Sequence, residues 1–226
     1  MKMIPVPFVI IKLLNKTYGA PPPLRKTGPV DELVRTILSQ NTNDRNSLAA
    51  FAVLKKNFKA WGGVLNTPVS KVARLIKHAG LANIKAGRIK DVLAEIKRRE
   101  GKISLARLER LDAQRAFAYL TSLKGVGPKT AACVLLFSFG KPVMPVDTHI
   151  FRVTKRLGII EGALDIEEAH RALTKIVPKH LIYPFHLSII QHGRRTCKAQ
   201  HPRCGVCVLY GMCRFKDKRL YKKVIP

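Results

Sequence analysis

Acidic residues are scarce in this sequence. Its 226 residues include 14 Asp and Glu against 42 Lys and Arg, which gives a formal net charge of +28. Hydrophobic residues still make up 46% of the chain, so the charge does not indicate disorder, and the length suits one large domain or two small ones. Such a charge favours a polyanionic partner, with nucleic acid considered first and an anionic membrane second. A solvated, lysine-rich surface is the remaining interpretation.

Long apolar runs are also missing, since none approaches the roughly 18 residues that a membrane span requires. Residues 1–14 loosely resemble a signal peptide, but Lys12 interrupts the apolar run and no small-residue cleavage site follows. We therefore predict a folded amphipathic helix over residues 6–18, no membrane partner and a cytoplasmic protein.

Alternating apolar and polar positions, which are typical of strands, are absent as well, so the sequence predicts an all-α fold of about ten short helices. Residues 83–99 have apolar positions at helical spacing with basic residues between them, which predicts a helix. Residues 130–139 are apolar nearly all round and are predicted to be buried. The predicted helix starts are Asp31, Asp44, Thr67 followed by Pro68, Asp112 and Asp165.

Cysteines are few and unevenly distributed. Cys133 lies in an apolar segment and is predicted to be a buried small hydrophobe. The other four form the pattern Cys197-x6-Cys204-x2-Cys207-x5-Cys213. Four thiolates this close indicate one metal centre in a reducing compartment rather than a disulfide scaffold. The pattern alone leaves zinc and a [4Fe–4S] cluster open, although zinc sites more often have two Cys-x2-Cys pairs.

The loop between the first two of these cysteines is basic. It contains Lys198, His201 and Arg203. We predict that a bound metal stiffens this loop and that Lys198 and Arg203 contact nucleic acid from it. A solvated surface is the alternative.

A glycine-containing segment, Leu123-Lys-Gly-Val-Gly-Pro-Lys-Thr-Ala131, separates two predicted helices. Gly125 and Gly127 permit a tight turn and expose backbone N–H groups at the start of the buried helix, where unpaired donors and the helix dipole favour a phosphate. This pattern predicts a helix–hairpin–helix motif in which Lys124, Gly125, Val126 and Gly127 grip a nucleic-acid backbone without reading its sequence. An ordinary tight turn between helices is the alternative.

Two further residues are candidates for catalysis. Lys129 follows the hairpin at the start of the buried helix, and Asp147 comes later in Val146-Asp-Thr-His149. A neutral lysine can act as a nucleophile, and a carboxylate can stabilise developing positive charge or move a proton. The simpler alternatives are a surface lysine and an N-cap aspartate for the helix that starts at Thr148, and Asp147 is able to do both.

These motifs occur together in the order found in the endonuclease III family. The hairpin at 123–131, the segment Val146-Asp-Thr-His-Ile-Phe-Arg-Val153 and the four-cysteine pattern all resemble that family. The segment Ile37-Leu-Ser-Gln-Asn-Thr-Asn-Asp44 resembles its early helix and loop. The resemblance covers roughly residues 28–215, and the combination of motifs is highly specific.

The resemblance implies an architecture and a cofactor. A continuous helical-barrel domain over residues 23–141 would carry the helix–hairpin–helix motif. An iron–sulfur cluster domain would combine residues 1–22 with 142–226, with a DNA groove between the two domains. The metal implied by the resemblance is a [4Fe–4S] cluster.

The resemblance also implies an activity and site residues. Lys129 matches the Schiff-base lysine and Asp147 the catalytic aspartate of a base-excision-repair DNA glycosylase with AP lyase activity. The implied partner is double-stranded DNA with a damaged base, in particular an oxidised pyrimidine, or with an abasic site. In the early loop, Gln40 and Asn41 are the implied DNA contacts, and Asn41 stands where the family often has a glutamine that fills the gap left by a flipped base. Leu81 matches a wedge residue, with an ordinary hydrophobic C-cap contact as the alternative.

Two departures from the family leave the lesion preference open. Asn41 is shorter than glutamine, and Pro128 replaces a basic residue and removes one N–H group. His149 is expected either to contact DNA or to pack against its neighbours. We expect a monomer in a prokaryotic cytoplasm, associated with the nucleoid.

Three competing functions differ from this interpretation at identifiable positions. Adenine glycosylases of the superfamily lack the lysine at 129 and place a catalytic glutamate where this chain has Thr36. Uracil/thymine mismatch DNA glycosylases characteristically have tyrosine in place of that lysine. A non-catalytic DNA-binding protein would keep the glycines and cysteines but would not need Lys129 and Asp147 together.

Overall fold

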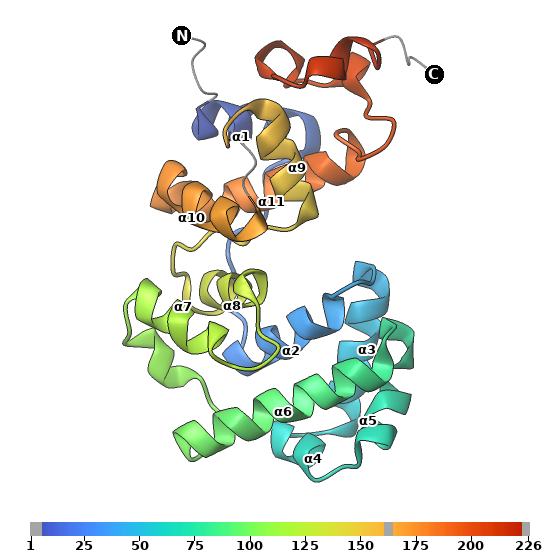
Figure 1. Cartoon of the computed structure of the whole chain (residues 1–226), viewed down its shortest axis with the longest axis vertical. Coiled ribbons are helices and arrows are strands. Elements are labelled where there is room, and N and C mark those ends of the chain that lie inside the picture. The colour runs from blue at the N-terminus through green and yellow to red at the C-terminus, as the bar shows by residue number, and fades with distance from the viewer. Residues whose placement is uncertain (1–5, 161–164, 223–226) are drawn as a thin grey trace. The chain divides into compact units, whose positions relative to one another are not determined.

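The computed structural model describes residues 6–160 and 165–222, and these residues form helices and connecting turns without any β-strand. They contain eleven α-helices, which confirms the all-α prediction (Figure 1). The chain divides into two compact units. The hairpin unit is Arg25–Lys141, and the cluster unit combines Met1–Leu24 with Pro142–Pro226.

The hairpin unit is built around the buried helix α8 (Pro128–Phe139). Residues 130–136 are all buried, including Cys133, as the apolar sequence predicts. Helix α2 (Pro29–Ser39) packs against α8, and α7 (Ala113–Thr121) precedes it across the hairpin. The long helix α6 (Ala82–Glu100) packs against α2 as well, so α2, α6 and α8 hold the segments that are candidates for DNA contact.

In the cluster unit, the central element is α11 (Ile182–Arg195). It packs against both α1 (Pro7–Tyr18) and α9 (Thr148–Leu157). The buried side chains of Ile10, Leu14, Phe185 and Ile189 form part of the core between these helices. The predicted N-terminal helix is therefore confirmed, and it packs on a helix that lies about 170 residues away in sequence.

Two of the predicted N-caps are present in the structure. The carboxylate of Asp112 accepts a hydrogen bond from the backbone N–H of Arg115 at 2.8 Å. Asp165 forms a capping box with Glu168, in which each side chain accepts from the other residue's backbone N–H. Each cap satisfies donors that the first turn of a helix leaves unpaired.

The predicted start at Asp31 is wrong. Helix α2 begins earlier, at Pro29, because a proline is well suited to the first helical position. Asp31 lies within the first turn, and its carboxylate accepts from Trp61 Nε1 at 2.7 Å and from Lys55 Nζ at 3.2 Å. The side chain therefore links helices instead of capping one.

The predicted helix start at Asp44 is confirmed, because α3 (Asp44–Asn57) begins at that residue and is capped by the side-chain oxygen of Asn43. The predicted cap at Thr67 is wrong. Its hydroxyl donates to the carbonyl of Gly63 at 2.8 Å, and the next helix begins after Pro68. The hydroxyl of Thr67 therefore bonds the preceding turn instead of the start of the next helix.

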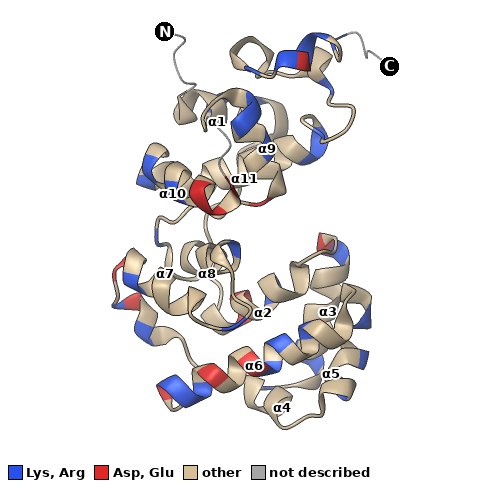
Figure 2. Ribbon diagram, viewed as in Figure 1, with Lys and Arg blue, Asp and Glu red and all other residues tan. Residues whose placement is uncertain are grey.

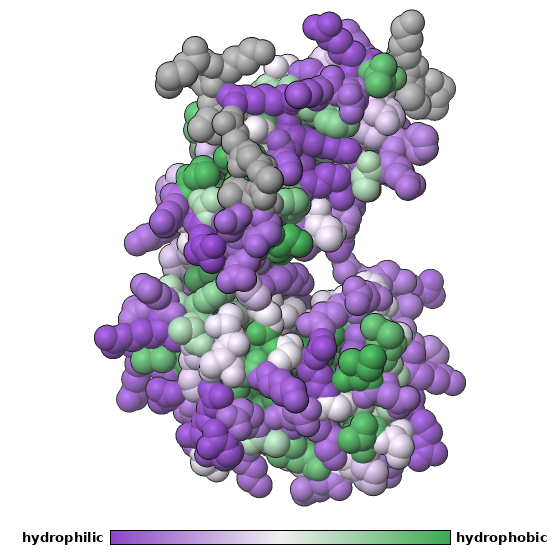
Figure 3. Space-filling model, in the orientation of Figure 1, coloured by the Kyte–Doolittle hydropathy of each residue, from purple (hydrophilic) through white to green (hydrophobic). Residues whose placement is uncertain are grey.

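No helix in the described part of the chain is long and apolar enough to cross a membrane. Lys and Arg are distributed over both units (Figure 2), and the face drawn in Figure 3 is mostly hydrophilic with small apolar patches.

The remaining α-helices are α4 (Trp61–Leu65), α5 (Val69–Leu75) and α10 (Ile166–Ile176). The 3₁₀ turns are η1 (Lys77–Ala79), η2 (Ala106–Glu109), η3 (Lys179–Leu181), η4 (Cys204–Val206), η5 (Tyr210–Met212) and η6 (Lys216–Arg219).

Candidate functional site

The hairpin between α7 and α8 presents backbone at the surface. Gly125 has φ +85°, a left-handed conformation that favours glycine. Lys124, Gly125 and Gly127 are exposed, whereas the side chain of Val126 is buried and its N–H donates to Leu123 O at 2.9 Å. Val126 therefore anchors the turn from inside, while the flanking backbone faces solvent.

The start of α8 combines a phosphate-binding geometry with a lysine. Gly127 is the N-cap and has no side chain to occupy the helix end, and Pro128 fills the first helical position. The next backbone N–H groups, of Lys129 and Thr130, have no acceptor within the first helical turn and so can bind an anion. Lys129 is half-buried here, on the first turn of the buried helix.

Gln40 connects the loop after α2 to this helix start. Its Nε2 donates to the hydroxyl of Thr130 at 3.4 Å, and its Oε1 accepts from Arg88 Nη1 at 2.5 Å. The amide of Gln40 is therefore bonded at both ends. The neighbouring Asn41 is exposed and has φ +52°, so its side chain is accessible to solvent.

Sequence reasoning did not identify Arg88, which lies in the middle of α6. Besides bonding Gln40, its side chain lies against the hairpin: a Cβ added at Gly125 would approach Arg88 Cδ to 2.8 Å. Arg88 thus bridges the loop at Gln40 and the turn at Gly125. No sequence signal separates it from the other basic residues of this helix, because both of its contacts are distant in sequence.

Leu81 immediately precedes α6 and projects from the surface. It is 53% exposed and has φ +49°. About half of this side chain is therefore accessible to solvent. An exposed leucine on a left-handed residue is the geometry expected of a wedge.

In the cluster unit, Asp147 is the N-cap of α9. Its Oδ1 accepts from the backbone N–H of Ile150 at 2.8 Å, so the predicted capping role is present. The side chain is only half-buried, so the cap fixes the position of a carboxylate that remains accessible. The capping bond does not compete with a further role, because a carboxylate has two oxygens and about four acceptor sites.

His149 is the second residue of α9 and is held by a half-buried arginine. Arg152 Nη2 lies 3.1 Å from His149 Nδ1 and donates to Gly193 O at 3.0 Å, while Arg152 Nε donates to Cys197 O at 3.0 Å. Burial lowers the pKa of Arg152 from its ordinary value. His149 thus packs against α11 through Gly193, and Arg152 ties α9 to the first cysteine of the loop.

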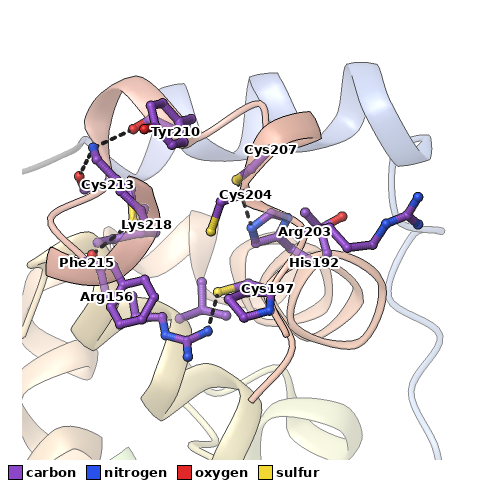
Figure 4. A pocket seen from close by; sticks show the side chains of 14 residues that line it. Arg156, His192, Cys197, Arg203, Cys204, Cys207, Tyr210, Cys213, Phe215 and Lys218 are labelled. Carbon is purple, nitrogen blue, oxygen red and sulfur yellow. Dashed lines mark hydrogen bonds between the residues drawn. The ribbon is translucent and has the colours of Figure 1, made fainter. Parts of the chain in front are cut away.

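The four clustered cysteines line one pocket (Figure 4). Burial raises the pKa of the Cys207 thiol to about 12 and also raises the pKa values of Cys204 and Cys213. Thiolates at these positions therefore require a bound cation. The four sulfurs around one pocket supply the number and type of ligands that a [4Fe–4S] cluster takes.

Hydrogen-bond donors surround this pocket. Arg156 Nη1 donates to Cys197 Sγ at 3.3 Å, and His192 Nε2 lies 3.7 Å from Cys207 Sγ. Burial lowers the pKa of His192 to about 4, so its ring is neutral, and Tyr18 Oη lies 3.0 Å from its Nδ1. In the tautomer that fits both partners, Nδ1 accepts from Tyr18 and Nε2 donates to the sulfur. Such donors stabilise sulfur ligands that carry negative charge.

The loop between the first two cysteines presents its basic side chains outward. Lys198, His201 and Arg203 are all exposed. Arg156 holds the loop backbone by donating to Lys198 O at 2.7 Å and to Ala199 O at 3.1 Å. The loop is therefore fixed by its backbone, which leaves its charged side chains accessible.

Known protein families match both the segment that contains the hairpin and the segment that contains the four clustered cysteines. Residues 34–179 match the model of HhH-GPD superfamily base excision DNA repair proteins, and residues 197–213 match the iron–sulfur binding domain of endonuclease III. Endonuclease III of Escherichia coli (strain K12) is 35% identical over 86% of this chain and 88% of its own length. The chain belongs to the endonuclease III family. It is a base-excision-repair DNA glycosylase by family and fold, and its cofactor is a [4Fe–4S] cluster.

Two solved structures of this superfamily are similar over nearly the whole chain. A non-covalent endonuclease III–DNA complex matches with a TM-score of 0.79 and 28% identity, covering 94% of this chain and 95% of that one. A thermostable thymine-DNA glycosylase matches with a TM-score of 0.73 and 25% identity, with the same coverage of 94% and 95%. The endonuclease III family therefore includes this fold in a DNA-bound form, and a thymine-DNA glycosylase has it too.

Proposed function

We propose that this protein is a bifunctional DNA glycosylase and AP lyase that removes damaged, chiefly oxidised, pyrimidines from duplex DNA. The observation that carries the proposal is the position of Lys129. Its amine extends from the first turn of a helix whose open N–H groups can bind a DNA phosphate. A backbone held there places a deoxyribose, rather than a base edge, beside the lysine.

The proposed reaction begins with extrusion of the damaged nucleotide, because C1′ of a stacked nucleotide is inaccessible. The neutral amine of Lys129 attacks C1′, the bond from C1′ to the base breaks, and the base leaves with the electron pair and takes up a proton. The attached nitrogen loses a proton, and its lone pair then breaks the C1′–O4′ bond; O4′ takes up a proton, and a Schiff base forms between C1′ and Lys129. Loss of a 2′ proton breaks the C3′–O bond, and the oxygen leaves with its phosphate.

Asp147 is assigned the electrostatic role in this sequence. Its carboxylate stabilises the positive charge that develops on the sugar as the base departs. The cap bond to Ile150 N–H fixes the carboxylate without neutralising it, which is what a preorganised charge requires. The four cysteines hold the cluster, which, when bound, ties the loop at 197–213 into a rigid shape.

The remaining site residues are assigned to DNA binding. Asn41 fills the gap left by the extruded nucleotide, and Leu81 enters the stack as a wedge, since both are exposed on left-handed backbone. The hairpin at Lys124–Gly127 contacts phosphates through its backbone. Lys198 and Arg203 add phosphate contacts from the cluster loop, and His149, packed against Gly193, has at most a secondary contact.

One second candidate function is favoured by a specific observation, the similarity to a thymine-DNA glycosylase. A mismatch glycosylase releases uracil or thymine and does not need a Schiff base. Lys129 supports the lyase instead, because mismatch enzymes of this kind characteristically have tyrosine there.

The test is incubation with duplexes that carry thymine glycol, a uracil mismatch or an abasic site. The proposal predicts base release with strand nicking on thymine glycol, and nicking at the abasic site. Base release without nicking would assign the mismatch function, and binding without either would assign a non-catalytic DNA-binding protein. Lys124→Gln, which changes another lysine of the same hairpin, is the matched control and should retain nicking with weaker binding.

A further inference from the structure

Lys85 is a buried lysine on α6 whose ammonium group contacts two separate loops. It is 2% exposed, and Nζ donates to the backbone carbonyls of Leu38 and Ala79, each at 2.7 Å. A buried ammonium group needs such partners because an unpaired charge is disfavoured away from water. Burial and the neighbouring Arg88 lower the pKa of Lys85 from its ordinary value. Because the carbonyl oxygens of Leu38 and Ala79 both accept from Nζ of Lys85, this nitrogen fixes the distance between the two loops.

Both acceptors lie just before the side chains assigned to enter the duplex. Leu38 lies near the end of α2, immediately upstream of the loop with Asn41. Ala79 ends η1 and is followed by Gly80 and Leu81. The backbone N–H of Lys85 also donates to Leu81 O at 2.9 Å. Lys85 therefore holds one loop by its side chain and the other by side chain and backbone together.

The two loops share an unfavourable backbone conformation. Asn41 has φ +52° and Leu81 has φ +49°, and among the described non-glycine residues only His201 also has a positive φ. Such residues persist where surrounding contacts impose the conformation, and they concentrate at functional sites. The ammonium group of Lys85 supplies a contact of this kind to both loops at once.

We propose that Lys85 is a positioning residue that sets the spacing and direction of Asn41 and Leu81, so that both side chains enter the duplex as one unit. The inference rests on the proposed function, because it needs a nucleotide to be extruded. Without Lys85 each loop relaxes separately. Extrusion of a paired base then becomes slower, whereas a nucleotide that is already unpaired reacts nearly as before.

Lys85→Met is the informative variant, because methionine fills a similar volume but donates no hydrogen bond. The matched control is Lys90→Met on the same helix. Lys90 is also a lysine with a backbone partner, Thr67 O, but it bonds neither of the two loops. Circular dichroism melting of both variants shows whether each one folds.

The first measurement uses equilibrium binding in a Lys129→Gln background, where no chemistry takes place. The DNA carries 2-aminopurine opposite a tetrahydrofuran abasic-site analogue, and its fluorescence rises when the wedge unstacks it. We expect both Lys85→Met and Leu81→Ala to lose most of this rise at saturating protein, and Lys90→Met to retain it. A full rise with Lys85→Met overturns the proposal.

The second measurement compares single-turnover base release from thymine glycol in a fully paired duplex and in a short unpaired bubble. Misplacement of positioning groups costs up to about 10²-fold in rate, and we expect Lys85→Met to slow the paired substrate by about tenfold or more while changing the bubble little. An equal loss on both substrates shows a purely structural role and overturns the proposal. Combining Lys85→Met with Leu81→Ala should cost less than the sum of the two single losses, because part of the effect of Lys85 passes through Leu81.

If Lys85→Met does not fold, Lys85→Arg keeps the charge and donors but forces the two carbonyls apart. Lys85→Arg should slow base release from the paired duplex more than from the bubble, by a smaller factor than Lys85→Met. An equal loss of rate on both substrates, relative to wild type, would contradict the proposal. The two proposals fail separately. Wild-type protein that unstacks 2-aminopurine but releases no base refutes only the proposed chemistry, whereas normal unstacking by the Lys85 variants refutes only the positioning role.

Discussion

Asp147 offers a way to separate a catalytic carboxylate from a helix cap. Asparagine caps helices about as well as aspartate, so Asp147→Asn keeps the bond to Ile150 N–H and removes only the charge. Asp147→Ala removes both. The loss of a cap costs about 1 kcal/mol, which lowers the melting temperature by about 2–4 °C in a chain of this size. The loss of charge at a helix N-terminus alone costs about 0.3–1 kcal/mol.

Both variants should lose activity to a similar extent, because both lack the charge. Removal of one preorganised electrostatic contact typically costs about 10²–10³-fold, so single-turnover base release from thymine glycol should fall by about that factor in each variant. Only Asp147→Ala should show the additional loss in melting temperature. The two effects are therefore separable in one pair of proteins.

Asp112 is the matched control, since it caps α7 through an equivalent bond of 2.8 Å to Arg115 N–H. Asp112→Asn and Asp112→Ala should reproduce the difference in melting temperature and leave the rate unchanged. Near-normal base release by Asp147→Asn would refute the catalytic assignment and leave Asp147 as a cap alone.

Three further outcomes are expected. DNA affinity should fall with salt with a slope of about −0.9 per phosphate neutralised, measured by fluorescence anisotropy, and a flat response would contradict phosphate contacts. Arg156→Met removes the donor to Cys197 Sγ and should speed the loss of visible cluster absorbance in air; unchanged decay would show that the bond does not protect the cluster. Arg98 and Arg99 lower the pKa of Glu95 to about 2, so its contribution to stability is present above its unfolded pKa and is lost as the pH falls towards 2. Glu95→Gln should therefore lower the melting temperature relative to wild type at pH 6, and this difference should become smaller as the pH falls. A difference that does not change with pH would contradict a stabilising interaction of Glu95 with Arg98 and Arg99.

The sequence predicts those parts of the site that depend on local chemistry. The glycines at 125 and 127, the cap at Asp147 and the cysteine spacing each act through neighbouring residues, and the structure has the turn, the cap and the shared pocket at those positions. The identity of the metal does not follow from neighbouring residues in the same way. The cysteine spacing leaves zinc open, and the match to the iron–sulfur binding domain of endonuclease III identifies the cluster.

The sequence does not predict the contacts that join distant segments. Lys85 and Arg88 are two of several basic residues in an amphipathic helix, and helical spacing alone gives no reason for Lys85 to be buried. Its burial depends on carbonyl groups from α2 and η1, which no pattern within α6 can reveal. The error at Thr67 has the same origin, because its hydroxyl bonds to a preceding turn instead of capping the next helix.

The central claim is that Lys129 forms a covalent Schiff base with the sugar. Sodium borohydride reduces such an intermediate to a stable cross-link, and mass spectrometry of the digested cross-link identifies the attached residue. We predict that wild-type protein is trapped on abasic duplex DNA through Lys129 and that Lys129→Gln is not trapped. Normal trapping of Lys129→Gln, or attachment through another lysine, would contradict the account.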